Sequence, residues 1–229
     1  MTKVVTFSIL LDMTTQRYKY PRTYHFPWSD SVMGDDHIFT DFDNLIGKEV
    51  VVTEKMDGEN TNIYPDGTHA RSIDSKYHPS RTWINKIQGE IGYKLMKDER
   101  LCGENLYARH SIEYKDLESY LYIFGYWSGT FCHSWDITVE RASGLGLTLA
   151  PVIYQGVWDE DLIKSLKEDI LSSNNTKEGF VVRLAEGFEM SEFTNSVAKY
   201  VRPNHVQTDQ HWMFSELIPN ELADTPKAE

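Results

Sequence analysis

The feature that most constrains this chain is a short apolar strand that ends in a lysine. Three valines, Val50–Val52, are followed directly by Thr53, Glu54 and Lys55. β-Branched residues favour an extended chain, so three in succession predict a buried strand. Farther on, Pro65-Asp66-Gly67 is a tight-turn sequence, because proline presets one φ angle and glycine accepts a positive one. The pattern therefore predicts a strand with Lys55 at the head of a hairpin.

Short strands and helices alternate along the rest of the chain. Strands are predicted over residues 2–11, 60–64, 68–73, 100–106, 120–127, 179–184 and 196–202. Helices are predicted over residues 80–100, 136–147 and 159–172, where apolar side chains recur every three or four positions. Because the strands are short and linked by turns, the pattern favours an α+β fold over a doubly wound α/β fold.

Composition narrows the classes of protein that this chain can be. Its 229 residues, 40% hydrophobic and 25% charged, predict a single domain over residues 1–229, and no apolar run is long enough for a membrane span. The net charge of −12 is opposite in sign to that of proteins that bind by non-specific phosphate attraction, so any contact with nucleic acid needs a local basic lining. The two cysteines lack a metal-binding spacing, which indicates reduced thiols and a cytoplasmic protein.

Lys55 is a candidate nucleophile. A lysine amine is protonated at neutral pH, and desolvation or neighbouring cations lower its pKa and free the amine. In the sequence Lys-x-Asp-Gly, Gly58 would let the backbone turn tightly beside a bulky ligand, and Asp57 could bind a metal or orient a ribose. The four residues alone leave open a second interpretation, a solvated lysine in a hairpin.

Further motifs follow in a characteristic order. They are Arg71-Ser72, Leu101-Cys102-Gly103-Glu104, the aromatic strand 121–126, and the segments 178–183 and 197–202. From residue 50 to residue 202, this order resembles the covalent nucleotidyltransferases, which are the polynucleotide ligases and mRNA-capping enzymes. Within them it resembles the ATP-dependent RNA ligases of the T4 RNA ligase 2-like type. The resemblance implies a nucleotidyltransferase (adenylation) domain of antiparallel sheets flanked by helices, with the nucleotide bound between them.

The resemblance also implies a role for each matched residue. Lys55 would take AMP from ATP, Lys199 would contact the α-phosphate and the departing pyrophosphate, and Glu178 would act with them in catalysis. The nucleotide-binding residues would be Glu54 beside the adenine, Phe124 stacked on it, Asn60 and Arg71 at a phosphate, Glu104 at the ribose or a metal, and Asp57, Gly58 and Arg202. Glu178 and Glu104 would bind Mg²⁺ or Mn²⁺.

Phosphoryl transfer asks a protein mainly for positioning and for neutralisation of charge. Lys199, Arg71 and Arg202 would supply cations, and by like-charge proximity they are expected to lower the pKa of Lys55. The resemblance predicts an RNA ligase that joins 3′-hydroxyl and 5′-phosphate ends. The reaction would pass through a lysyl-AMP and an adenylylated 5′-phosphate.

The sequence departs from the family pattern at three points. Gly125 stands where these ligases often have an acid, and the last motif reads Lys-x-x-Arg rather than Lys-x-Lys. Only 27 residues follow Arg202, so no separate C-terminal accessory domain is expected and a partner protein could supply RNA-binding surface. The alternatives are a DNA ligase, a GTP-dependent capping-type nucleotidyltransferase, or a non-catalytic nucleotide- or RNA-binding protein.

One further segment bears on nucleic acid. Residues 18–25 read Tyr-Lys-Tyr-Pro-Arg-Thr-Tyr-His, which interleaves aromatic rings with cations. Such a mixture suits stacking on unpaired bases. A loop packed over the core explains the segment equally well.

Overall fold

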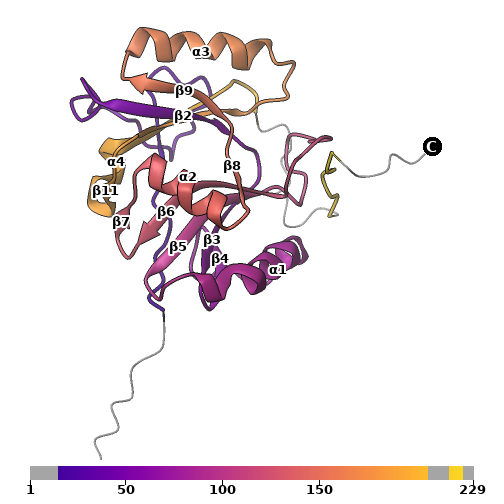
Figure 1. Cartoon of the computed structure of the whole chain (residues 1–229). Helices are drawn as coiled ribbons and strands as arrows, with labels where there is room; N and C mark the ends of the chain where they lie inside the picture. The colour runs from indigo at the N-terminus through magenta and orange to yellow at the C-terminus, as the bar shows by residue number, and fades with distance from the viewer. Residues whose placement is uncertain (1–14, 206–216, 224–229) are drawn as a thin grey trace, which may run out of the picture.

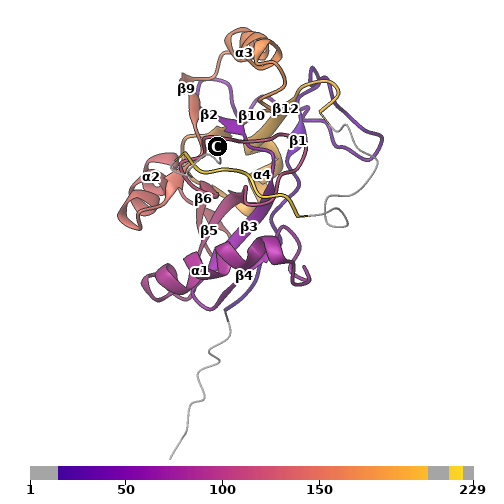
Figure 2. The ribbon, with the colours of Figure 1, turned by 90° about the vertical axis from the view of Figure 1, so that its right-hand side faces the viewer.

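Two β-sheets and four α-helices make up the computed structural model, which describes residues 15–205 and 217–223 (Figures 1 and 2). The first sheet has the strand order β1-β12-β10-β2-β9. Its strands are β1 (Tyr24–His25), β2 (Glu49–Lys55), β9 (Val152–Val157), β10 (Gly179–Leu184) and β12 (Val197–Val201). Neighbouring strands are antiparallel except for β1, which runs parallel to β12. Because β2 lies between β10 and β9, the three valines are fully buried, as predicted.

The second sheet has the strand order β11-β7-β6-β5-β3-β4, with β8 paired to β6. Its strands are β3 (Glu59–Tyr64), β4 (Gly67–Ala70), β5 (Glu99–Asn105), β6 (Leu121–Ser128), β7 (Phe131–Cys132), β8 (Thr148–Leu149) and β11 (Phe188–Glu189). The turn at Pro65-Asp66-Gly67 joins β3 to β4, as predicted, although β4 ends at Ala70. The prediction that Lys55 heads this hairpin is wrong, because β2 and β3 belong to different sheets and residues 56–58 cross between them.

The described residues form four α-helices, three of which cover the outer faces of the two sheets, while the short fourth helix lies directly before β12. They are α1 (Thr82–Ile91), α2 (Trp135–Gly144), α3 (Glu160–Ser172) and the short α4 (Phe193–Ser196), with 3₁₀ turns at Pro79–Arg81, Gly92–Lys94 and Met190–Glu192. Helices α1 and α2 pack on the second sheet through Ile84, Ile91 and Ala142. Helix α3 packs on the first sheet through Ile163 and Ile170 (Figure 1). Each sheet therefore has one covered face and one face turned toward the other sheet.

The predicted α+β class is confirmed, with differences at the ends of elements. Strand β10 matches the predicted 179–184, and α3 begins after Asp159, whose carboxylate caps it by accepting from two backbone N–H groups. The helix predicted over residues 80–100 is wrong beyond residue 91, since Glu99 and Arg100 start strand β5. Arg100 is fully buried and donates a hydrogen bond to the carbonyl oxygen of Tyr18. The strand predicted over residues 2–11 lies outside the described residues.

None of the helices in the described part of the chain is long and apolar enough to span a bilayer.

Candidate active site

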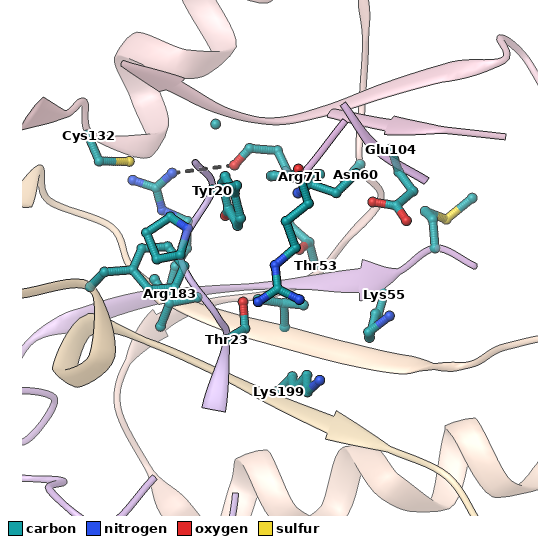
Figure 3. Close-up of a pocket in the computed structure, with 18 of the residues that line it drawn as sticks. Tyr20, Thr23, Thr53, Lys55, Asn60, Arg71, Glu104, Cys132, Arg183 and Lys199 are labelled. Atoms are coloured by element: carbon teal, nitrogen blue, oxygen red, sulfur yellow. Dashed lines mark hydrogen bonds between the residues drawn. The ribbon is translucent and has the colours of Figure 1, made fainter. Parts of the chain in front are cut away.

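A cavity of about 260 Å³ lies between the two sheets and contains most of the predicted site residues. Alternate residues along a strand point to the same face, so each sheet contributes alternate positions. The first sheet contributes Thr53, Lys55, Val181 and Lys199, and the second contributes Asn60, Glu104, Tyr122 and Phe124. Arg71, which follows β4, and Glu54 also line the cavity; Figure 3 shows Lys55, Asn60, Arg71, Glu104 and Lys199 around it. The space between the sheets is where the family resemblance places the nucleotide.

The pairing of β10 with its neighbours fixes the reacting end of the cavity. Gly179 lies opposite Lys55 in β2 and opposite Val201 in β12. A Cβ atom at Gly179 would lie 2.0 Å from the Tyr200 carbonyl oxygen, so only glycine fits there. Glu178, just before it, is thereby held beside Lys55, with 2.6 Å between Lys55 Nζ and Glu178 Oε1.

The environment of Lys55 differs from the one predicted. Burial by itself lowers the pKa of Lys55, but the carboxylates around it, above all Glu178 in the ion pair, outweigh burial and raise the pKa above its ordinary value. The expectation that neighbouring cations lower this pKa is therefore wrong for the protein without ligands. Lys55 is held as an ammonium ion in an ion pair.

Lys199 is the lysine whose pKa is lowered. Burial, followed by the charge of Lys55, lowers the pKa of Lys199 to about 8. The side chains of Lys199 and Arg71 have no ion pair or hydrogen bond within residues 15–205 and 217–223. Figure 3 shows both reaching into the space beside Lys55. The cavity thus offers two cations that no carboxylate neutralises directly, which suits a phosphate chain.

Glu104 faces the same end of the cavity from β5. Its Oε1 accepts a hydrogen bond from the backbone N–H of Gly58 at 3.2 Å. Burial raises the pKa of Glu104 to about 8, although the nearby Lys55 acts in the opposite direction. At neutral pH this carboxyl is largely protonated and can donate as well as accept a hydrogen bond.

Behind Lys55, three buried side chains form a group suited to a metal ion. One ligand atom from each of Asp57, Glu178 and His205 lies within 4.8 Å of the others. His205 Nε2 is 3.4 Å from Asp57 Oδ1 and 3.3 Å from Glu178 Oε1. Glu178 Oε2 is buried and has no hydrogen-bond partner among the described residues. Carboxylate oxygens with an unused acceptor fit Mg²⁺ or Mn²⁺, and the imidazole nitrogen is compatible with the latter.

Several predicted residues lie elsewhere than expected. Arg202 donates to the carbonyl oxygens of Lys177 and Pro203, so it braces the turn before Glu178 rather than lining the cavity. Gly58 is tightly packed, but against the second sheet rather than a ligand, since a Cβ there would lie 2.4 Å from the Asn105 carbonyl oxygen. Glu104 is not part of the three-residue group behind Lys55.

Other lining residues were not predicted to contribute to the site. Tyr20 lies in the cavity wall, with its ring 5.6 Å from the Phe124 ring in an edge-on contact. Arg183 also lines the cavity, and it donates to the carbonyl oxygens of Leu184 and His133. The aromatic and basic composition of residues 18–25 was the available signal for Tyr20. His205 lies after the last of the matched motifs, and no motif in the sequence marks it as a site residue.

Comparison with solved structures identifies the fold. Two forms of an archaeal ATP-dependent RNA ligase superpose with a TM-score of 0.55 at 14% and 15% identity, over 80% of this chain and 48% of theirs. A putative ATP-dependent DNA ligase from Aquifex aeolicus gives a TM-score of 0.50 at 22% identity, over 81% of this chain and 50% of that one. The chain thus spans about half the length of these structures. No curated protein matches.

A family model described as RNA ligase matches residues 48–201, the segment that carries every motif from Lys55 to Lys199. The match does not specify a branch, so the likeness to the T4 RNA ligase 2 type stays a prediction. The motif order in the sequence, the two facing sheets and this match agree: the chain belongs to the RNA ligase family.

Proposed function

We propose that this protein is an ATP-dependent RNA ligase that joins a 3′-hydroxyl end to a 5′-phosphate end. The observation that carries the proposal is the position of Lys55 at the end of a buried strand. Its amine lies in a cavity with a carboxylate cluster on one side and, on the other, two cations that have no ion pair among the described residues. The archaeal structures of the same fold are named as ATP-dependent RNA ligases, which agrees with this choice of nucleotide and strand.

In the first step, the Lys55 amine attacks the α-phosphorus of ATP. A P–N bond forms, the bond between the α-phosphorus and the bridging oxygen breaks, and pyrophosphate leaves. The amine must lose a proton before it attacks, and Glu178 Oε1, at 2.6 Å, is the nearest acceptor. Lys199 and Arg71 would bind the phosphates and stabilise the charge that builds on the leaving group.

The rest of the cavity would hold the nucleoside. Phe124, with Val181 on the facing sheet, provides apolar surface for the adenine, and Glu54 and Asn60 provide polar groups in the lining. Glu54 is held by Lys177, whose Nζ lies 3.4 Å from its carboxylate. Glu104, largely protonated at neutral pH, could donate a hydrogen bond to a ribose hydroxyl.

A divalent cation fits the group behind Lys55. Glu178, with Asp57 and His205, would hold it. Glu104 lies near enough for the charges of Glu178 and Asp57 to raise its pKa. When bound, such a cation neutralises carboxylate charge beside Lys55 and negative charge on the triphosphate, which favours the uncharged amine.

Two further transfers complete the proposed reaction. An oxygen of the RNA 5′-phosphate attacks the phosphorus of AMP, the P–N bond breaks, and Lys55 regains its proton. The 3′-hydroxyl of the other strand then attacks the RNA 5′-phosphorus, loses its proton to a base, and displaces AMP. Lys55 ends in its starting state, so the protein turns over.

Labelling with nucleotides tests the proposal. The protein would be incubated with Mg²⁺ and α-labelled ATP or GTP, or with NAD labelled in its AMP half, and examined for label that survives denaturation. We expect label from ATP alone, and none in Lys55→Ala or in the charge-preserving Lys55→Arg. Label from GTP would indicate a capping-type enzyme, and binding of ATP without covalent label would indicate a nucleotide-binding protein. RNA and DNA strands with the same ends would then separate an RNA ligase from a DNA ligase.

A further inference from the structure

A second hollow, of about 310 Å³, opens to solvent beside the nucleotide cavity. Its wall consists of Lys19, Tyr20, Pro21, Arg22, Tyr24, His37, Arg71 and Thr194, and we call it the outer basin. Four of these residues, Tyr20, Pro21, Arg22 and Arg71, also line the nucleotide cavity, so the two spaces share a wall. A molecule seated in the outer basin would therefore lie next to a nucleotide held at Lys55.

The outer basin is positively charged in a protein that is negative overall. Its lining contains three cations, Lys19, Arg22 and Arg71, and no carboxylate, whereas the whole chain carries a net charge of −12. Neither Lys19 nor Arg71 has an ion pair in the part of the chain that the structure describes. Arg22 is paired at 3.4 Å with Asp35, a carboxylate that is 81% exposed. Burial and then the charge of Arg22 lower the pKa of Arg71, so these cations repel one another until an anion lies between them.

The position of these cations is set by both sheets. The Tyr18 carbonyl accepts a hydrogen bond from Arg100 on the second sheet, and the Tyr20 N–H donates to the carbonyl oxygen of Arg71. Tyr24 then pairs with Ala198 of β12, directly before Lys199. Residues 18–25 thus run from one sheet to the other and form a fixed wall, rather than the tip of a loop.

The basin also presents an aromatic surface. The Tyr24 ring lies against the ring of His37, with 5.0 Å between their centroids and a tilt of 34°. Aromatic rings next to cations are the usual lining of sites for single-stranded nucleic acid, because bases stack on the rings while the cations bind phosphates. A small inorganic anion would need the cations but not the ring.

We propose that the outer basin binds the 5′-phosphorylated terminal nucleotide of an unpaired RNA donor strand. Lys19, Arg22 and Arg71 contact its phosphate, and its base lies against Tyr24. The inference rests on the proposed ligase function, because that reaction brings a 5′-phosphate to an AMP on Lys55. Arg71 connects the two spaces: it lies in their shared wall and reaches toward Lys55 and Lys199 (Figure 3).

Binding to two RNA probes tests the inference directly. A labelled single-stranded RNA oligonucleotide with a 5′-phosphate is compared with the same oligonucleotide ending in a 5′-hydroxyl, by fluorescence anisotropy at several salt concentrations. The label is at the 3′ end, and no ATP is added. The variants are Lys19→Ala, Arg22→Gln and Tyr24→Leu. Lys164→Ala, which removes one partly exposed lysine of α3 paired with Glu160, is the matched control.

The wild type and the Lys164→Ala control should bind the phosphorylated probe at least about 5-fold more tightly than the hydroxyl probe, consistent with charge-assisted hydrogen bonds to the phosphate. Lys19→Ala and Arg22→Gln should reduce this ratio and lower the slope of log affinity against log salt by about one each. Tyr24→Leu should weaken both probes by about 10-fold and leave the ratio intact, because it removes stacking rather than charge. The thermal unfolding midpoint of each variant verifies that it is folded.

Equal affinity of the wild type for the two probes would overturn the inference. The inference would also be overturned if Lys19→Ala, Arg22→Gln and Tyr24→Leu bound both probes as Lys164→Ala does. The same holds if a nicked duplex bound as tightly as the single-stranded probe with a 5′-phosphate. These outcomes are distinguishable from failure of the proposed function. A protein that forms lysyl-AMP but does not discriminate the probes refutes the basin alone, and one that discriminates them but forms no lysyl-AMP refutes the ligase mechanism alone.

Discussion

Replacing Glu104 with glutamine should stabilise the folded protein by an amount that grows as the pH rises. Burial raises the pKa of this carboxyl from an ordinary value of 4.5 to about 8. Between these two values the folded protein holds a proton that the unfolded chain has released. Stability therefore falls as the pH rises through this window, and the cost is complete only above pH 8. Glutamine has the same shape, keeps an acceptor for the Gly58 N–H, and never ionises.

The magnitude follows from the size of the shift. At about 1.4 kcal/mol per pKa unit, the full shift corresponds to roughly 5 kcal/mol, an upper bound for a carboxyl so close to Lys55. Between pH 6 and pH 8 the wild type should lose about 2 kcal/mol of unfolding free energy through this one group. Glu104→Gln should not show this loss, so the difference in stability between the two proteins should grow with pH.

Urea denaturation of both proteins at pH 6, 7 and 8, with EDTA present, measures this difference. Titrating groups that do not interact with Glu104 are common to both proteins and cancel. Glu113→Gln is the control, since Glu113 is an exposed carboxylate whose pKa is lowered by Lys115 and it should show no gain that grows with pH. A difference between wild type and Glu104→Gln that stays constant from pH 6 to pH 8 would refute a raised pKa at this position.

Three further outcomes follow from the structure. Because the pKa of Lys199 is about 8, this side chain loses its charge as the pH rises from 7 to 9, whereas arginine keeps its charge. The affinity of the wild type for ATP, measured by calorimetric titration, should therefore fall relative to that of Lys199→Arg. Affinities that change in parallel over this range would contradict the lowered pKa of Lys199. Gly179→Ala should cost at least about 2 kcal/mol of stability because its Cβ would collide with the Tyr200 carbonyl oxygen. Gly89→Ala, in open space on α1, should instead add up to about 1 kcal/mol. Thermal unfolding measures both variants, and equal changes in stability would contradict the predicted collision at Gly179. His205→Ala should raise the Mn²⁺ concentration needed for half-maximal labelling by roughly 10-fold or more, as losses of metal-site side chains do; an unchanged requirement would exclude His205 as a ligand.

The strands of the core were predictable because their sequence pattern is local. The valines of β2 and the short, mostly apolar runs of β10 and β12 mark buried strands by themselves, and the capped helix α3 has a clear apolar face. The error at residues 92–100 has a physical reason. Helical spacing continues past Ile91, but Arg100 finds hydrogen-bond partners only as part of β5, a tertiary effect that the periodicity does not contain.

The candidate site was predictable as a set of residues but not as an electrostatic environment. The sequence shows Lys55, Glu178 and Lys199 as motifs, and it does not show which of them touch. Pairing of β2 with β10 places the Glu178 carboxylate on Lys55, which reverses the expected direction of the Lys55 pKa. Arg202 and Gly58 differ from their predicted roles for the same reason. Both contact backbone carbonyl groups, and these contacts are set by the tertiary fold.

The central claim is that the Lys55 amine forms a covalent bond to AMP inside the cavity between the sheets. Peptide mapping by mass spectrometry, after incubation with ATP and Mg²⁺ and quenching under alkaline conditions, tests it most directly. The account predicts one AMP per protein, attached to Lys55, and its disappearance when pyrophosphate is added. AMP on another residue, or an unmodified Lys55 in a folded protein that binds ATP, would contradict it.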